Sequence, residues 1–235
     1  QRSLREVADA HYRLAGIHFG LGDADAAVEV LERASGLDPE PDRVEAALRE
    51  GLASAPKSLR LARLFEDFCR AGDRRAALVD ALVAVADRDE DPRPALREAY
   101  ELSLAGGDDA RGEKLLVRIV EEVGGSEDTA WALVALGERR LAAGTVAEAA
   151  DLFEKASALS SPDDERSLLV RVAKLAEDPL GDDPRAIAIL DRLREREPAD
   201  REFWSPLVRL YKKGVDLAAL CTLLDPRFRE RRDLL

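Results

Sequence analysis

Apolar residues recur every three or four positions along most of the chain, and short turns that contain glycine separate the apolar segments. This spacing places the apolar side chains of one segment on a single face of an α-helix. We therefore expect an all-α protein of about thirteen helices without any strand.

A glycine, usually followed by aspartate, recurs between the helical segments at spacings of 50, 35, 37, 37 and 33 residues. Glycine can take a positive φ at the end of a helix, and the next Asp or Thr can cap the following helix. We predict a capping box from Thr145 to Glu148, and N-caps at Ser161 and Asp183, each followed by proline. The glycines of these turns are Gly22, Gly72, Gly107, Gly144, Gly181 and Gly214.

Three segments that follow a turn share an apolar pattern with spacings of four and then three residues, and a proline lies beyond each. The small residues of the pattern let two helices approach closely, and the larger ones fill the groove beside them. Proline cannot continue a helix, so the chain must turn there. The patterns are Ala27, Leu31 and Ala34 before Pro39; Ala149, Phe153 and Ala156 before Pro162; and Ala186, Leu190 and Leu193 before Pro198.

Together these features resemble the tetratricopeptide repeat (TPR), a helix–turn–helix unit of about 34 residues. The resemblance implies one right-handed α–α superhelix, or solenoid, over residues 1–235, with about five to six degenerate repeats whose first helices line a concave wall. The matching first-helix positions are His11, Leu14, Ala15 and His18; Leu133, Leu136 and Gly137; and Trp204, Leu207 and Tyr211. Gly107 opens a weaker copy of the repeat, with Gly112, Leu116 and Ile119.

The gap between Gly22 and Gly72 exceeds one repeat by about half a repeat. The excess, near residues 42–55, is itself helical in pattern, since Val44, Leu48 and Gly51 share a face. We expect one extra helix here, which would shift the helix phase and kink the array, or else an eroded repeat. Residues 87–94 and Gly124-Gly125 are the expected flexible points.

Charged residues make up 36% of the chain and the net charge is −12. Arginine outnumbers lysine by thirty to six, and Asn and Met are absent, which indicates a GC-rich bacterial genome. No apolar run is long enough to span a bilayer, so we expect a cytoplasmic protein. The chain begins without Met, which suggests a fragment or a processed product and leaves removal of a signal peptide open.

The acidic segment from Asp87 to Glu98 has the spacing of an EF-hand calcium loop, with Asp89 and Asp91 between. Its sixth position, which requires glycine for a sharp turn, is Pro92, whose φ is fixed negative. We therefore interpret this segment as an acidic connection between helices, and expect no metal there.

His11 and His18 share one predicted helix face, but a zinc site would need further ligands. Cys69 and Cys221 lie in distant apolar segments and are expected to be buried. No nucleophile elbow or acid–base pair stands out, so we predict no catalytic residue, no metal and no cofactor. The basic tail, residues 227–232, suits a solvated helix or an acidic partner, while the net charge disfavours nucleic acid.

Members of the TPR family that clamp a carboxylate terminus or an extended peptide use asparagine, which this chain lacks. The expected wall instead offers Arg, Glu and a few aromatic residues, which suit a partner helix or a folded surface. For Tyr12 and Trp131 the alternative to partner contact is that both side chains are buried between repeats. The predicted partner-binding residues are Tyr12, Phe19, Glu66, Arg97, Glu101, Trp131, Glu138, Arg171 and Arg209, with Gly16 beside them.

We therefore expect a non-catalytic scaffold that binds an unidentified protein in its concave groove. The alternative is a structural spacer or oligomerisation segment of a larger multidomain protein. A hidden enzyme or metal-binding module is the third hypothesis, and stoichiometric zinc or calcium in the purified protein would support it. The sequence determines neither the partner nor the oligomeric state.

Overall fold

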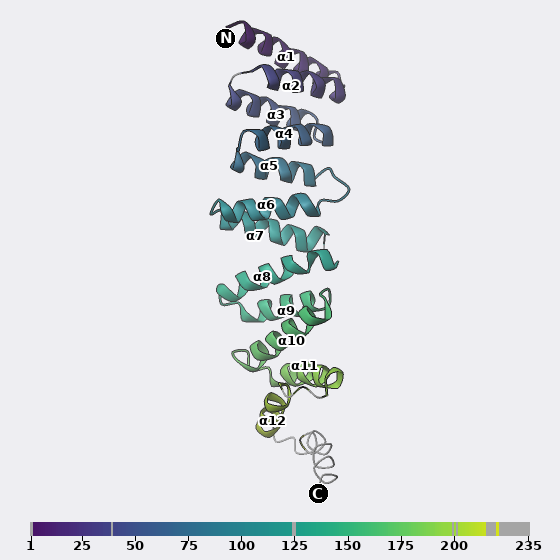
Figure 1. The fold of residues 1–235 in the computed structure, drawn as a ribbon, viewed down its shortest axis with the longest axis vertical. Helices are drawn as coiled ribbons and strands as arrows, with labels where there is room; N and C mark the ends of the chain where they lie inside the picture. Colours follow the sequence, from purple (N-terminus) through teal and green to yellow (C-terminus); the bar gives the residue numbers. More distant parts are fainter. Residues whose placement is uncertain are drawn as a thin grey trace. The chain divides into compact units, whose positions relative to one another are not determined.

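The computed structural model describes residues 2–38, 40–123, 126–198, 200, 202–214 and 220. Within these residues the chain forms twelve α-helices, one π-helical turn and one 3-10 turn, and no strand (Figure 1). The all-α helical-repeat prediction is confirmed. Pro39, Gly124-Gly125, Cys221 and residues 227–232 lie outside the described part. The chain divides into two compact units, residues 1–123 and 124–235.

Unit 1 consists of three helical hairpins and one additional helix. The hairpins are α1/α2, α4/α5 and α6/α7, and α5 also packs against α6. Helix α3 spreads its contacts over α1, α2 and α4, and it lies where the sequence predicts an extra helix. The elements are α1 (Arg2–Gly20), α2 (Ala24–Leu37), α3 (Pro41–Ser54), α4 (Leu59–Ala71), α5 (Arg75–Ala86), α6 (Arg93–Ala105), α7 (Asp109–Arg118) and a π turn (Ile119–Val123).

Unit 2 contains two hairpins, α8/α9 and α10/α11, with α9 against α10 and α12 against α11. One apolar cluster runs through α9, α10, α11 and α12 and includes the fully buried Phe153, Phe203 and Leu207. The elements are a 3-10 turn (Glu127–Thr129), α8 (Ala130–Ala142), α9 (Val146–Ser157), α10 (Pro162–Glu177), α11 (Asp183–Arg196) and α12 (Trp204–Lys213).

Four of the predicted glycine turns have the left-handed backbone that glycine favours. Gly22, Gly107, Gly144 and Gly181 take φ values from 68 to 81°. In three of these turns the following aspartate caps the next helix by accepting the N–H three residues on; the caps are Asp23, Asp108 and Asp182. The turn chemistry expected from sequence is therefore present at these positions.

Gly72 and Gly214 end α4 and α12 as predicted, but neither takes the predicted left-handed conformation; Gly214 has φ −79°, and at Gly72 the left-handed position is shifted by one residue. Gly72 has φ −94°, while Asp73 takes the left-handed φ of 49°. Aspartate tolerates this conformation better than most residues. Arg74 then occupies the N-cap position of α5 without a capping side-chain bond. Its guanidinium instead forms ion pairs with Asp42 and Glu45 of α3.

Two further predicted caps need correction. The Thr145 hydroxyl donates to the Arg140 carbonyl at 3.0 Å, so it closes the preceding helix and leaves no capping box with Glu148. Glu148 instead pairs with Arg140 at 3.2 Å. The α11 cap is Asp182, because the left-handed glycine precedes it directly, and Asp183 begins the helix. The predicted Ser161 cap is confirmed by its bond from the Asp164 N–H.

The predicted small–large–small faces are buried. Ala149, Phe153 and Ala156 are fully buried in unit 2. A Cβ added at Gly137 would lie 2.6 Å from the Phe153 ring, closer than side chains tolerate. Helices α8 and α9 therefore reach their spacing only because position 137 lacks a side chain. The other two sets, Ala27, Leu31 and Ala34, and Ala186, Leu190 and Leu193, are at most 5% exposed.

We predict that Gly137→Ala destabilises the protein by about 1–3 kcal/mol, because the new methyl group overpacks the contact with Phe153. Urea denaturation followed by circular dichroism measures this change. The matched control is Gly36→Ala in α2, where a Cβ meets no atom within 4 Å. It should be neutral or stabilising by up to about 1 kcal/mol. Equal effects of the two substitutions would contradict the packing described for Gly137.

Candidate functional site

Helices α1 and α3 border a groove of about 340 Å³ whose sides carry two aromatic residues, Tyr12 and Phe19. The groove exists because small residues face each other across it. A Cβ at Gly16 would meet nothing within 4 Å, so this position is open. Gly51, by contrast, is buried and packs tightly against Leu31, Leu61 and Phe19, which closes the floor. The small lining residues are Ala15, Gly16, Gly20, Ala47, Gly51 and Ser54.

A second hollow of about 410 Å³ adjoins this groove and shares Phe19 and Ser54 with it. It lies between the α1–α2 turn and the α3–α4 connection. Its charged lining residues are Asp25 and Lys57. Phe19 and Ser54 therefore lie between the two hollows.

The Tyr12 ring is held in place from the α2–α3 connection. Its hydroxyl donates to Asp38 at 3.0 Å, and the Asp38 side chain is fully buried. The Arg43 guanidinium lies over the Tyr12 ring at 5.7 Å and pairs with Asp9 and Asp38. Burial and the bond to Asp38 raise the pKa of Tyr12 above its ordinary value, so the hydroxyl remains a donor at neutral pH. The groove therefore has a rigid aromatic side.

The predicted wall residues of unit 1 beyond the groove are joined in ion pairs. Glu66 on α4 is only 7% exposed and accepts bonds from Arg63 and Arg70, both close to 3.0 Å. Arg70 also reaches Glu98 on α6 at 2.6 Å and holds the pKa of Glu98 below its usual range. On the same helix as Glu98, the predicted residues Arg97 and Glu101 pair with each other at 3.2 Å.

Unit 2 shows the same arrangement. Glu138 on α8 pairs with Arg171 on α10, so the structure brings two predicted residues together. The Arg171 guanidinium also lies 4.2 Å from the centre of the Phe153 ring. Arg209 on α12 pairs with Glu177 on α10 at 2.6 Å. Trp131 is partly buried near the start of α8. These pairs join first helices that lie one repeat apart.

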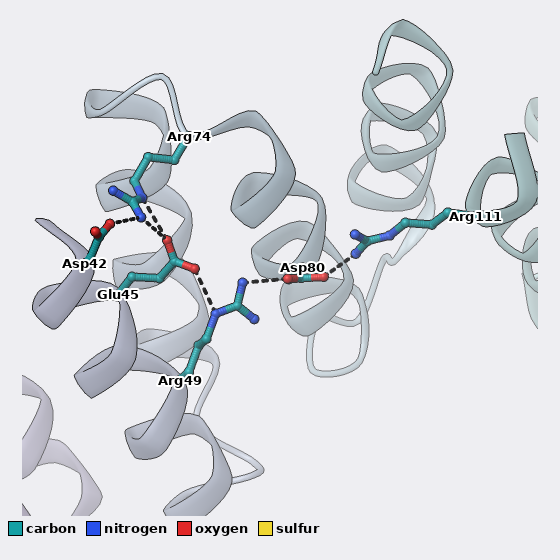
Figure 2. A network of polar contacts seen from close by, with 6 residues as sticks. All are labelled: Asp42, Glu45, Arg49, Arg74, Asp80 and Arg111. Carbon is teal, nitrogen blue, oxygen red and sulfur yellow. Dashed lines mark hydrogen bonds and ion pairs between the residues drawn. The ribbon is translucent and has the colours of Figure 1, made fainter. Parts of the chain in front are cut away.

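A second network of ion pairs, which the sequence did not predict, joins α3, α5 and α7 in unit 1 (Figure 2). Asp80 on α5 accepts from Arg49 on α3 at 2.6 Å and from Arg111 on α7. Each of these partners lies 31 residues away in sequence. Arg74 similarly joins Asp42 and Glu45 of α3 at 2.6 and 2.7 Å. Opposite charges at the repeat spacing are the sequence signal that could have found it.

The four carboxylates at the EF-hand spacing in this segment are each paired with an arginine. Asp87 pairs with Arg118, Asp89 with Arg63, Asp91 with Arg93 and Glu98 with Arg70, at 2.6 to 2.7 Å. No group of three or more metal-ligating side chains occurs in the part of the chain that the structure describes.

The remaining chemistry-bearing residues have local roles. His11 Nδ1 lies 2.8 Å from the Val7 carbonyl, and His18 lies 3.9 Å from Asp23. Cys69 is fully buried, and burial raises its pKa to about 11, so the thiol is unreactive at neutral pH. None of the described helices is long and apolar enough to cross a membrane.

No protein-family model and no curated protein matches the sequence. Among solved structures the chain is similar to MamA (16% identity, 75% of this chain and 96% of that chain, TM-score 0.41). It is also similar to PilW, a type IV pilus biogenesis factor (19%, 86% and 98%, TM-score 0.38). A third is a Podosopora anserina protein described as a kinesin light chain with TPR-like repeats (17%, 92% and 91%, TM-score 0.37). These likenesses concern the helical-repeat fold and identify no partner.

We predict that Asp80→Asn lowers the free energy of unfolding by about 0.5–1 kcal/mol at low salt, because it removes the negative charge between Arg49 and Arg111 and replaces one of the two acceptor oxygens with an NH2 group. The loss should shrink in about 1 M NaCl, which screens the pairs. The matched control is Asp73→Asn, which removes only an exposed pair with Arg75 and keeps a residue that tolerates the left-handed turn. A larger loss for Asp73→Asn than for Asp80→Asn would contradict the network.

We also predict a pH-dependent contribution from Glu138. Hydrogen bonds from Arg171 lower the pKa of Glu138 below its ordinary value. The stabilisation is therefore present above the ordinary glutamate pKa and is lost as the pH falls through the lowered value. Glu138→Gln should destabilise the protein at about pH 7 and have a smaller effect at about pH 3. Chemical denaturation at both pH values measures this, and an equal loss at both would contradict the shift.

Proposed function

We propose that this TPR-like helical repeat chain is a non-catalytic scaffold that binds a partner protein along its first helices. The observation that carries the proposal is the α1–α3 groove, with Tyr12 and Phe19 on its sides and open space at Gly16. Grooves of about 300–1,000 Å³ are large enough to accept specific ligand groups. Aromatic residues are frequent anchors of protein interfaces.

The groove is suited to a large apolar side chain from a partner helix. Its lining residues are mostly glycine, alanine and aromatic residues, and Glu50, Ser54 and the Tyr12 hydroxyl supply polar groups. Because Asp38 and Arg43 already hold the Tyr12 ring, binding costs little additional side-chain entropy there. A helix places such an anchor in the groove while its neighbouring residues contact the surrounding surface.

The predicted charged residues add a polar surface to each unit. In unit 1 Arg97 and Glu101 are each more than half exposed, so a partner can exchange ion pairs with them. In unit 2 the same holds for Arg209. Rim charges of this kind contribute to steering and register more than to affinity. Glu66 is too buried for such contact, and we assign it the role of positioning Arg63 and Arg70. Trp131, Glu138 and Arg171 form the corresponding surface in unit 2.

The test is to close the groove without disturbing the fold. Gly16→Leu places a side chain into open space on α1, and we expect it to abolish capture of the partner. Gly36→Leu on α2, also in open space, is the matched control and should capture as the wild type does. Both variants are checked by circular dichroism. They are then immobilised beside the wild type and incubated with lysate of the source organism, and retained proteins are identified by mass spectrometry.

A protein retained by the wild type and by Gly36→Leu, but lost with Gly16→Leu, would support the groove as its binding site. Equal capture by all three chains would contradict the groove, and capture by none would favour a structural spacer or oligomerisation segment. That second hypothesis rests on one specific observation, the apolar outer face of α1.

A further inference from the structure

A hollow of about 470 Å³ in unit 1 is lined by residues of α3, α5 and α7 and by the residue just before α5. It shares no lining residue with the α1–α3 groove. Four of its lining residues are arginines, two are carboxylates and the other two are alanines in the first turn of α5, so no large apolar side chain fills it. We call it the arginine hollow. Its charged lining residues are Glu45, Arg49, Arg74, Arg75, Asp80 and Arg111.

The arginines of the hollow outnumber its carboxylates because each carboxylate is shared. Glu45 accepts from Arg49 at 3.0 Å and from Arg74 at 2.7 Å. Asp80 accepts from Arg49 at 2.6 Å and from Arg111. Figure 2 shows the resulting chain, in which three guanidinium groups hold two carboxylates between them. The fourth arginine leaves the lining with a formal excess of two positive charges.

The carboxylates that balance this excess lie outside the hollow. Asp42 pairs with Arg74 at 2.6 Å, and Asp73 pairs with Arg75 at 3.2 Å. The side chains of Asp42 and Asp73 are 91 and 82% exposed. Those of Arg74 and Arg111 are only 26 and 30% exposed. Water and salt screen exposed charges more strongly than partly buried ones, so the two outer carboxylates neutralise the hollow only in part.

Two of the arginines also retain unused hydrogen-bond donors. A guanidinium group carries five N–H donors. Within the part of the chain that the structure describes, Arg111 bonds to Asp80 alone. Arg75 likewise bonds to Asp73 alone. The remaining N–H groups of these two arginines are available to an acceptor in the hollow, which would add to the ion pairs of Figure 2 and displace none of them.

We propose that the arginine hollow binds a phosphate group. A phosphate monoester carries about 1.5 to 2 negative charges at neutral pH and has three strong acceptor oxygens. This charge matches the excess of the lining, whereas a single carboxylate would neutralise half of it. The planar guanidinium group binds phosphate oxygens in pairs. Arg75 and Arg111 donate to the phosphate oxygens, while Arg49 and Arg74 supply positive charge and hold the two carboxylates away from the anion.

A free phosphate ion and a phosphorylated side chain of another protein share this chemistry, and titration distinguishes them. The full chain, in a phosphate-free buffer of low salt at about pH 7, is titrated with sodium phosphate and with a short glycine peptide that contains one phosphoserine. Isothermal calorimetry measures binding. The same peptide with serine, and sodium acetate at equal ionic strength, are the controls. We expect saturable binding of the phosphate group and none of either control.

Tighter binding of the phosphopeptide than of inorganic phosphate would support the site and assign it to a phosphorylated partner. The reverse order would support the site and assign it to the free ion. Acetate binding as tight as phosphate binding would overturn the assignment to a doubly charged anion.

Variants then locate the site. Arg75→Gln and Arg111→Gln each remove a guanidinium group from the hollow and should weaken phosphate binding by about tenfold or more. Arg60→Gln on α4 is the matched control, because Arg60 is 46% exposed in the same unit and does not line the hollow. All three substitutions remove one positive charge, so a general effect of net charge would change their binding alike.

Circular dichroism and thermal unfolding verify that each variant is folded. Arg75→Gln removes only an exposed ion pair, so it tests the site even if Arg111→Gln lowers stability. Phosphate binding that the two hollow variants weaken and Arg60→Gln does not would support the proposal. Absence of saturable phosphate binding by the wild type would overturn it. Equal weakening by all three variants, or by none, would place the binding elsewhere on the chain and would also overturn it.

Discussion

The architecture depends on the close approach of neighbouring helices, which small residues permit and large residues on the facing helix complete. Gly137 against Phe153 is the tightest example, since no side chain at position 137 could be accommodated at the observed spacing. Gly51 has the same role where α3 meets Leu31, Leu61 and Phe19. Neither helix of such a pair can bury its apolar face alone, so each one is stabilised by its neighbours along the unit.

This dependence also explains how the charged residues are used. Helices one repeat apart lie close enough for arginine to reach a carboxylate on the next equivalent helix, as Arg111 reaches Asp80 and Arg171 reaches Glu138. Most residues that resemble a recognition surface in the sequence are therefore also structural ion pairs. A partner that contacts them must exchange one set of charged hydrogen bonds for another, which favours specificity of position over net affinity.

Helix α1 is the exception on both of its free sides. On its inner side, facing Gly and Ala residues of α1 and α3 leave a groove instead of a filled contact, and Tyr12 is fixed beside it. On its outer side, large apolar residues such as Leu14 and Ile17 are exposed, at 43 and 59%. Both surfaces have one cause: α1 meets fewer neighbouring helices than the first helices in the interior of each unit.

The sequence by itself determined the helices, the left-handed turns at four of the six glycines, the buried small–large–small faces and the helix near residues 42–55. These follow from local periodicity and from the backbone limits of glycine and proline, which need no knowledge of distant residues. Tertiary structure alone decided that Asp73 and not Gly72 takes the left-handed conformation, that Thr145 bonds backwards to Arg140, and that Glu138 pairs with Arg171. It also decided where a groove remains open, because a void depends on how two helices separated in sequence are rotated and spaced.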